Sequence, residues 1–422
     1  MWNRLLNSIL NRIIRKGTLE LHLPDGTHYT YGDGSGTAVV VRITDPSTPR
    51  RMVLNPELAV GEAYMDGTLT IDGEDLYGLL RLAQSNLSSS GPVLWLRPLD
   101  MLRTAGRSLA QFNPVRRAQR NVAHHYDLSG ELYDLFLDKD RQYSCAYFRH
   151  DGDTLEQAQE QKKHLIARKL LLKPGMRVLD IGCGWGGMAL TLAKDYDVHV
   201  LGITLSEEQH KIAEQRARDA GLQDRVQFRL MDYRDVAGTY ERIVSVGMFE
   251  HVGVPHYQTF FAHLRDRLTE DGVALLHTIG RADQPTHTSP WLAKYIFPGG
   301  YTPALSEVMQ AIEKENLYTT DIEVLRLHYA KTLHEWHRRF MANIDKARDL
   351  YDERFCRMWQ YYLVSAEQSF RYYRQTVFQI QLTRQQDAVP LTRDYLYPSE
   401  TSEQIPAAPP SGLRMVRTGS RR

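Results

Sequence analysis

The sequence predicts an α/β fold, with a mostly parallel sheet covered by helices, preceded by a smaller N-terminal α+β domain. Three observations support this prediction. Apolar strand candidates alternate with helical stretches in the middle of the chain, which is typical of a parallel sheet. A glycine-rich turn follows the first of these strands. The chain also has 422 residues with 42% hydrophobic side chains, which is enough for more than one domain.

The first 16 residues are predicted to form a basic amphipathic helix. Trp2, Leu6 and Ile13 recur at helical spacing among arginines, and no acidic residue interrupts them. Such a helix could lie in the headgroup region of an anionic membrane, or it could pack as an ordinary helix on its own domain. Periodicity alone does not separate the two interpretations.

The rest of the N-terminal region alternates between short apolar runs and turn residues. Residues 17–70 are therefore predicted to form a small β-rich unit, and residues 72–85 a helix. Serine, glycine and proline at residues 85–92 predict a break. We place an N-terminal domain at residues 1–95 and a basic linker at residues 96–120, where arginines far outnumber acidic residues. The linker could contact phosphates or be a solvated helix.

Residues 121–395 are predicted to form the larger domain. After residue 305 this domain is expected to be mostly helical, and it is unusually aromatic from Phe355 to Phe378. The last residues, 396–422, are rich in proline, serine and arginine and are predicted to be disordered. The strand candidates of the larger domain are residues 177–181, 198–203, 226–230, 243–246 and 273–277.

The glycine-rich turn at residues 178–187 is the strongest local signal. Gly182, Gly184 and Gly187 match the G-x-G-x-x-G pattern of dinucleotide sites. Two features oppose a dinucleotide. Asp180 would repel a pyrophosphate at the helix N-terminus, and the position about 20 residues later, where an acid should bind the ribose, reads Gly-Ile-Thr.

A cationic cofactor without phosphate removes the first objection. The D-x-G-x-G pattern resembles the first motif of class I methyltransferases, which bind S-adenosylmethionine at this strand end. A tight turn without a ligand is the simpler interpretation, but the strand-turn-helix context favours a bound cofactor. The resemblance implies these cofactor contacts: Tyr143, Ser144, Asp180, Gly182, Gly184, Thr204, Gln209, Asp232 and Tyr233.

Charge and cysteine content argue against several classes of function. The 52 basic and 51 acidic residues give a net charge of +1, which predicts no general attraction for nucleic acid. Residues 245–251 also lack the Asn/Asp-Pro-Pro-Tyr motif of enzymes that methylate nucleobase amino groups. The 3 cysteines form no C-x-x-C pair, and adjacent Glu250 and His251 are weak evidence for a metal, so we predict neither a disulfide nor a metal site. The apolar runs are too short to span a bilayer.

Five sequence blocks occur in an order that is specific, although each block alone is weak evidence. They closely resemble the cyclopropane-fatty-acyl-phospholipid synthase and mycolic acid cyclopropane synthase family over residues 121–393. Residues 61–67 extend the resemblance into the N-terminal domain. The blocks are residues 143–148, the glycine-rich turn, and residues 246–253, 277–280 and 295–300.

The resemblance implies a class I methyltransferase fold with a mostly parallel seven-stranded sheet and helices on both faces. It also implies that the methyl carbon of S-adenosylmethionine is added to a cis double bond of a phospholipid acyl chain and closes into a cyclopropane ring. An alkene has no proton to remove before attack. The site must therefore align its π face with the methyl donor, stabilise a carbocation and exclude water. A base must then remove one proton.

In this family the base is a bound bicarbonate. The resemblance places its site, and the catalytic residues, at Glu250, His277 and Tyr329, with backbone groups of Cys145 and Ile279. Tyrosine, histidine and backbone N–H groups can donate to a small anion, and Glu250 can accept from its hydroxyl. Each side chain also has a plain structural alternative as a helix cap, a satisfied core histidine or a packed tyrosine. The ordered blocks favour the catalytic interpretation.

The same resemblance implies partners at a membrane surface. The N-terminal domain of the family is linked to dimerisation and lipid engagement, so we expect a homodimer in the cytoplasm, bound peripherally to the inner face of the cell membrane. The aromatic C-terminal helices suit an acyl tunnel or plain core packing. Two alternatives remain open. One is a related lipid C-methyltransferase that leaves a methyl-branched acyl chain, and the other is a non-catalytic lipid-binding protein that keeps only the fold.

Overall fold

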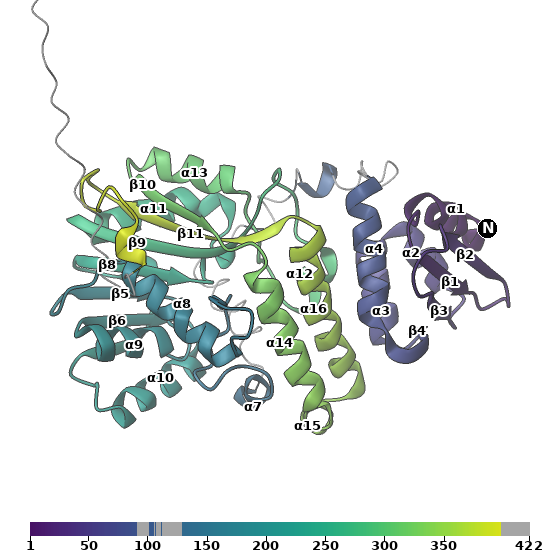
Figure 1. Cartoon of the computed structure of the whole chain (residues 1–422), viewed down its shortest axis with the longest axis horizontal. Coiled ribbons are helices and arrows are strands. Elements are labelled where there is room, and N and C mark those ends of the chain that lie inside the picture. Colours follow the sequence, from purple (N-terminus) through teal and green to yellow (C-terminus); the bar gives the residue numbers. More distant parts are fainter. Residues whose placement is uncertain (91–100, 105, 107–110, 112–128, 398–422) are drawn as a thin grey trace, which may run out of the picture.

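Two β-sheets organise the chain (Figure 1). The computed structural model describes residues 1–90, 101–104, 106, 111 and 129–397. The predicted basic linker and the predicted disordered tail lie largely outside these described residues.

The first sheet belongs to the N-terminal region and has the strand order β2-β1-β3-β4. β1 (Thr18–His22) pairs antiparallel with β2 (His28–Gly32) and parallel with β3 (Val39–Ile43). β3 in turn pairs antiparallel with the short β4 (Leu69–Ile71). Alternate side chains of β1 and β3 are buried, because one face of the sheet is covered by helices.

Two predictions about this region are corrected. Residues 17–70 are not β-rich throughout, because helices α2 (Thr48–Leu54) and α3 (Pro56–Met65) interrupt them. Each of these helices has a proline in its first turn, where a fixed φ and a missing N–H favour a helix start. The predicted break at residues 85–92 also begins too early, since α4 (Leu76–Ser90) continues to Ser90. The buried Asn86 fixes this end of the helix to the segment after α1, because its side chain accepts from the backbone N–H groups of Arg15 and Lys16 and donates to the Lys16 carbonyl.

The N-terminal helix α1 (Trp2–Ile13) packs on its own domain. Leu6 is buried in the core of the small sheet, and Trp2, Ile9 and Ile13 are partly buried against the same core. This arrangement supports the ordinary-helix interpretation of the amphipathic pattern. Leu5, on the outer side, keeps 43% of its surface exposed.

The second sheet has the order β10-β11-β9-β8-β5-β6-β7 and confirms the predicted parallel α/β fold. All five predicted strands are present, and the neighbours from β9 through β7 are parallel. Only β11 runs antiparallel, between β9 and β10. The bounds are β5 (Arg177–Ile181), β6 (His199–Thr204), β7 (Val226–Leu230), β8 (Tyr240–Val246), β9 (Leu268–Arg281), β10 (Tyr318–Val324) and β11 (Gln375–Thr383).

Helices cover both faces of this sheet. Along β5, Val178 joins one hydrophobic cluster while Leu179 and Ile181 join another, as alternating side chains of a fully covered strand must. The first cluster lies under α8, α9 and α10, and the second under α11 and α13 (Figure 1). The bounds are α8 (Leu155–Lys169), α9 (Gly187–Tyr196), α10 (Glu207–Asp219), α11 (Tyr257–Arg267) and α13 (Leu305–Lys314).

The prediction that the chain is mostly helical after residue 305 is wrong for β10 and β11. Phe378, counted among the aromatic helical residues, lies in β11. In β11, Gln379 and Gln381 alternate with apolar residues, a pattern that is typical of a strand with one exposed face. Both glutamine side chains are nevertheless buried. Their amides are satisfied by distant residues, since Lys169 donates to Gln379 and Gln381 donates to the Lys169 carbonyl.

A layer of helices joins the two sheets. α16 contacts α3 and α4 of the N-terminal region, and it also contacts α14 and β11 (Figure 1). Gly61 on α3 allows close contact with α12, because a Cβ there would lie 2.5 Å from the ring of Trp291. Among the described residues, no helix combines the length and apolar composition of a membrane span. The layer contains α12 (Pro290–Tyr295), α14 (His328–Ala342), α15 (Ile344–Leu350) and α16 (Glu353–Tyr372).

Candidate active site

The glycine-rich turn connects the central strand β5 to α9 at the carboxyl edge of the sheet. Gly182 has φ +82° and Gly186 has φ +85°, conformations that side chains rarely adopt. A Cβ on Gly182 would also lie 2.8 Å from the Cβ of Met248. The glycines therefore bring backbone, rather than side chains, to the surface of the neighbouring pocket.

Asp180 lies at the base of this turn. Its side chain is buried, and its Oδ2 atom has no hydrogen-bond partner within the described part of the chain. Burial raises the pKa of Asp180 to about 7, while the positive charge of Lys162 acts in the opposite direction. A buried carboxylate with an unsatisfied oxygen favours a cationic ligand.

All nine predicted cofactor contacts line one pocket at this edge of the sheet. The end of β6 contributes Thr204, whose hydroxyl donates to Gln209 Oε1 over 2.8 Å. After β7, the Asp232 carboxylate accepts two hydrogen bonds from Arg234, each over 2.7 Å. The other predicted contacts in the pocket are Tyr143, Ser144, Asp180, Gly182, Gly184 and Tyr233.

Several lining residues were not predicted as contacts. Arg141, Trp185, Arg234, His251 and His256 also line the pocket. Trp185 lies in the glycine-rich turn and His251 in the block at residues 246–253, so the sequence could have indicated both. Arg141, Arg234 and His256 lie outside the five sequence blocks. Burial lowers the pKa of His251 to about 4, so this imidazole is neutral at physiological pH.

These residues fit S-adenosylmethionine. The ligand is a sulfonium cation without phosphate, and the pocket pairs a close backbone approach with the unsatisfied oxygen of Asp180. Asp180, Asp232 and the glycine-rich turn would hold it. When bound, it supplies an electrophilic methyl carbon.

The five residues of the predicted bicarbonate site lie beside this pocket rather than on its wall. Glu250, in the 3-10 turn Phe249–His251, accepts a hydrogen bond from the backbone N–H of Ile279 over 2.6 Å. Ile279 also packs against the cluster that contains Cys145 and Tyr329. His277, on β9, pairs with the end of β8, just before Glu250. The structure thus brings Glu250 to Ile279, two residues after His277 on β9, and places Cys145 and Tyr329 in the adjoining hydrophobic cluster.

The protonation states at this place follow from burial. Burial raises the pKa of Glu250 to about 7, and its Oε2 atom has no partner among the residues described. Burial lowers the pKa of His277, which is therefore neutral. Its Nδ1 lies 3.1 Å from the Gln379 amide nitrogen, which assigns the imidazole proton to Nε2. An N–H donor and a carboxyl that titrates near neutrality can hold a small anion and exchange a proton.

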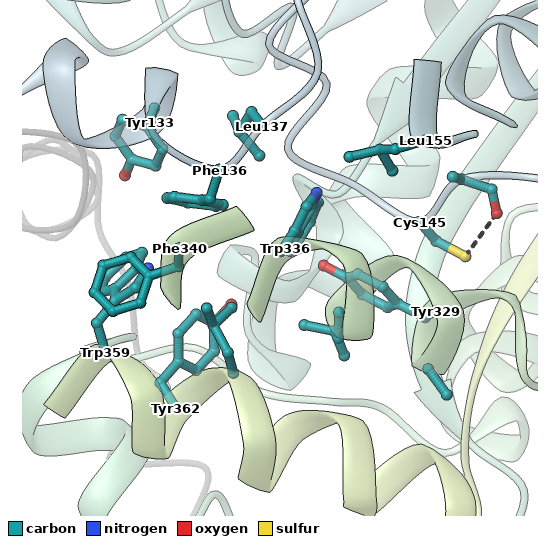
Figure 2. Close-up of a cluster of buried hydrophobic side chains, with 14 of the residues drawn as sticks. Tyr133, Phe136, Leu137, Cys145, Leu155, Tyr329, Trp336, Phe340, Trp359 and Tyr362 are labelled. Carbon is teal, nitrogen blue, oxygen red and sulfur yellow. Dashed lines mark hydrogen bonds between the residues drawn. The ribbon is translucent and has the colours of Figure 1, made fainter. Parts of the chain in front are cut away.

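Figure 2 shows an aromatic cluster that contains Cys145 and Tyr329. Tyr143 of the cofactor pocket and Ile279 pack against the same cluster. Trp336 stacks on Tyr143 of the pocket, and its ring meets Tyr329 edge-on. Tyr362 on α16 lies with its hydroxyl 3.0 Å from that of Tyr143. Cys145 lies at the same end of the cluster as Tyr329, and burial raises its thiol pKa, so the sulfur is not a thiolate. The site is therefore enclosed by apolar walls.

The chain is similar to enzymes of lipid methylation. Residues 114–380 match the family described as mycolic acid cyclopropane synthetase, and residues 5–90 match a domain of unknown function, DUF7884. The chain is 42% identical over 331 residues to cyclopropane-fatty-acyl-phospholipid synthase of Escherichia coli (strain K12), which covers 78% of this chain and 84% of that protein. It is 33% identical over 407 residues to tuberculostearic acid methyltransferase UfaA1 of Mycobacterium tuberculosis, over 90% of this chain and 91% of that protein.

A solved structure supports the same assignment. Mycolic acid cyclopropane synthase CmaA1, complexed with SAH and CTAB, has a TM-score of 0.60 and 34% identity over 64% of this chain and 99% of that chain. The fold predicted from the resemblance, a class I methyltransferase domain, is thereby confirmed. The chain belongs to the mycolic acid cyclopropane synthetase family and is an S-adenosylmethionine-dependent methyltransferase that acts on lipids.

Proposed function

We propose that the enzyme adds the methyl carbon of S-adenosylmethionine to a cis double bond of a phospholipid acyl chain and closes a cyclopropane ring. One observation carries the proposal most strongly. Glu250 and His277 are both buried next to segments that line the cofactor pocket, and Ile279, whose N–H donates to Glu250, packs against the aromatic cluster. The name of the Escherichia coli relative supports the phospholipid substrate.

Bound bicarbonate as the general base is part of this proposal. Neutral His277 can donate from Nε2, and the Glu250 carboxyl can accept from a bicarbonate hydroxyl or exchange a proton with it. The aromatic faces of Tyr329 and Trp336 would stabilise a carbocation on the acyl chain. The residues thus divide the tasks of base positioning, charge stabilisation and exclusion of water.

Purified enzyme, radiolabelled S-adenosylmethionine and liposomes of unsaturated phospholipid test the reaction. We expect label in the lipid fraction, and mass spectrometry should show a gain of one CH₂ per altered chain. Removal of dissolved CO₂ should slow product formation, and added bicarbonate should restore it. Label transfer that is indifferent to bicarbonate contradicts the base assignment, and lipid binding without label transfer contradicts the proposed reaction on phospholipid.

A second candidate is a lipid C-methyltransferase that leaves a saturated methyl branch. The similarity to UfaA1, a relative named as a methyltransferase and matched over 90% of this chain, favours it. The products are distinguishable, because a saturated branch adds two hydrogens beyond the CH₂ of a cyclopropane. Methyl transfer alone supplies no hydride, so the liposome assay is repeated with a hydride donor such as a reduced nicotinamide. Finding that mass only in the presence of the hydride donor would select the second candidate.

We further propose that the enzyme is a homodimer that binds peripherally to the inner face of the cell membrane, and that nucleic acid is not a partner. Although one side of α1 packs on its own domain, the exposed Leu5 and the arginines of the helix support membrane contact by its outer side. Light scattering of the full chain measures its oligomeric state. Sedimentation with anionic and neutral vesicles measures membrane binding, which should fall as salt increases.

A further inference from the structure

One wall of the cofactor pocket is a segment between α7 (Gly130–Asp134) and α8 that forms neither helix nor strand. Residues 141–144 of this segment line the pocket. Because no regular backbone ladder fixes the path of the segment, side chains from other elements must hold it. Helix α8 provides one support, since the fully buried Lys162 donates to Gln142 Oε1 over 2.6 Å and to Ser144 Oγ over 2.8 Å.

Arg216 on α10 provides a second support and joins the segment to the glycine-rich turn. Its guanidinium donates to the Asp140 carboxylate and, over 3.3 Å, to the Asp140 carbonyl. It also donates to the carbonyl of Trp185 in the turn, over 2.7 Å. A planar guanidinium has several donors in a fixed geometry, so one side chain can hold both stretches of backbone in register.

The Asp140 carboxylate packs directly on the start of α9. A Cβ on Gly187, the first residue of that helix, would lie 2.4 Å from Asp140 Oδ2, and negative charge is favoured at a helix N-terminus. The carboxylate also accepts from the side chains of Lys163, over 2.8 Å, and Gln142, over 3.0 Å. Burial acts to raise the pKa of Asp140, but the positive charges of Lys163 and Arg216 hold it below its usual value.

We propose that Arg216 and Asp140 are positioning residues, which hold residues 141–144 against the glycine-rich turn and so preform the pocket for S-adenosylmethionine. Neither side chain lines the pocket, so their effect passes through the backbone that they join. Without this contact, only a fraction of the molecules hold the two stretches at binding distance, and the apparent affinity falls by that fraction. The role concerns cofactor binding and does not depend on the proposed lipid acceptor.

Calorimetric titration of the full chain with S-adenosylmethionine tests the proposal. Arg216→Met keeps an unbranched side chain but removes every donor, and we expect its Kd to be about tenfold higher, as for a binding-competent fraction of about one tenth. Arg216→Lys keeps the charge but not the planar set of donors, so its Kd should lie between the two. Arg218→Met is the matched control and should bind like wild type, because Arg218 pairs with Glu214 on its own helix.

Two further measurements separate positioning from a general loosening of the fold. If Asp140 and Arg216 act through one contact, Asp140→Asn should also raise the Kd, and the double variant should add little to the larger single effect. In the liposome assay, Arg216→Met should raise the KM for S-adenosylmethionine about tenfold with kcat nearly unchanged, since saturating cofactor selects the ordered segment. Calorimetry needs no lipid, so failure of the proposed lipid reaction leaves the binding test intact.

Three results would overturn the proposal. The first is a folded Arg216→Met variant with the Kd of wild type. The second is a pair of single effects that multiply in the double variant, because the two side chains would then act independently. The third is a lower kcat with an unchanged KM. Should Arg216→Met not fold, Arg216→Lys and Asp140→Asn make the same comparison, and wild-type affinity in both would be equally decisive.

Discussion

Replacing Glu250 with glutamine should stabilise the protein at high pH while removing its activity. The side chain is buried. Its Oε1 accepts a 2.6 Å hydrogen bond from the Ile279 N–H, whereas its Oε2 has no partner among the described residues. Burial raises the pKa from 4.5 to about 7, so the folded protein binds a proton that the unfolded chain has already lost. The contribution of the Glu250 carboxyl to the free energy of unfolding is therefore fully present below pH 4.5, and it is lost as the pH rises through about 7.

The magnitude follows from the two pKa values. Relative to a group that stays neutral in both states, Glu250 lowers the free energy of unfolding by about 3 kcal/mol at pH 8 and by about 1 kcal/mol at pH 5, where it is protonated in the fold but partly ionised in the unfolded chain. Glutamine is neutral at both pH values. Any cost of placing its amide at the position of Oε2 is also equal at both and cancels in the comparison. Between pH 5 and pH 8, the free energy of unfolding of Glu250→Gln should therefore rise relative to wild type by about 2 kcal/mol.

Urea unfolding of wild type and Glu250→Gln at pH 5 and pH 8, in buffers free of dissolved CO₂, measures this difference. Glu313→Gln, at an exposed position on α13, is the control and should show no such change. Lipid mass spectrometry should find almost no cyclopropane product from Glu250→Gln. A stability difference that is the same at both pH values would refute the reasoning, because it would mean that Glu250 titrates normally in the fold.

Three further substitutions test the architecture. Gly182→Ala should lower the affinity for S-adenosylmethionine at least about tenfold in calorimetry, because φ is +82° and the new Cβ would lie 2.8 Å from Met248. Trp336→Ala should lower the free energy of unfolding by about 3 to 5 kcal/mol, since the side chain is fully buried in the aromatic cluster. Glu62→Ala removes a carboxylate that accepts from Arg51, Lys294 and Tyr295, and limited proteolysis should then release the N-terminal domain faster.

Each of these tests has a clear opposite outcome. Gly152→Ala is the control for the turn, because a Cβ there meets nothing within 4 Å, and equal binding by both alanine variants would remove the argument from the glycine-rich turn. An unchanged free energy of unfolding in Trp336→Ala would show that the aromatic cluster contributes little to the stability of the core. Unchanged proteolysis of Glu62→Ala would show that its contacts do not hold the two parts of the chain together.

The errors of the sequence-based predictions have two causes. Residues 48–65 were assigned to a β-rich unit because turn residues surround them, and the prolines that begin α2 and α3 resembled further turn signals. β11 was missed because its buried glutamines resemble polar positions on a helix. In β11 the deciding contacts come from Lys169, more than 200 positions earlier, which a local pattern cannot contain.

The sequence by itself determined the features that depend on local chemistry. The five parallel strands follow from short apolar runs, and the turn after Ile181 follows from glycines that adopt positive φ. The ordered blocks identified the family, and with it the nine residues that share the cofactor pocket.

Only the tertiary structure decided how these residues are charged and supported. Asp180 and Glu250 titrate near pH 7 because strands and helices distant in sequence exclude water from them. Lys162 looks like one of many surface lysines in a charged helix, yet it is fully buried beneath the pocket. Desolvation is a property of the assembled core, so no reading of neighbouring residues along the chain could have revealed it.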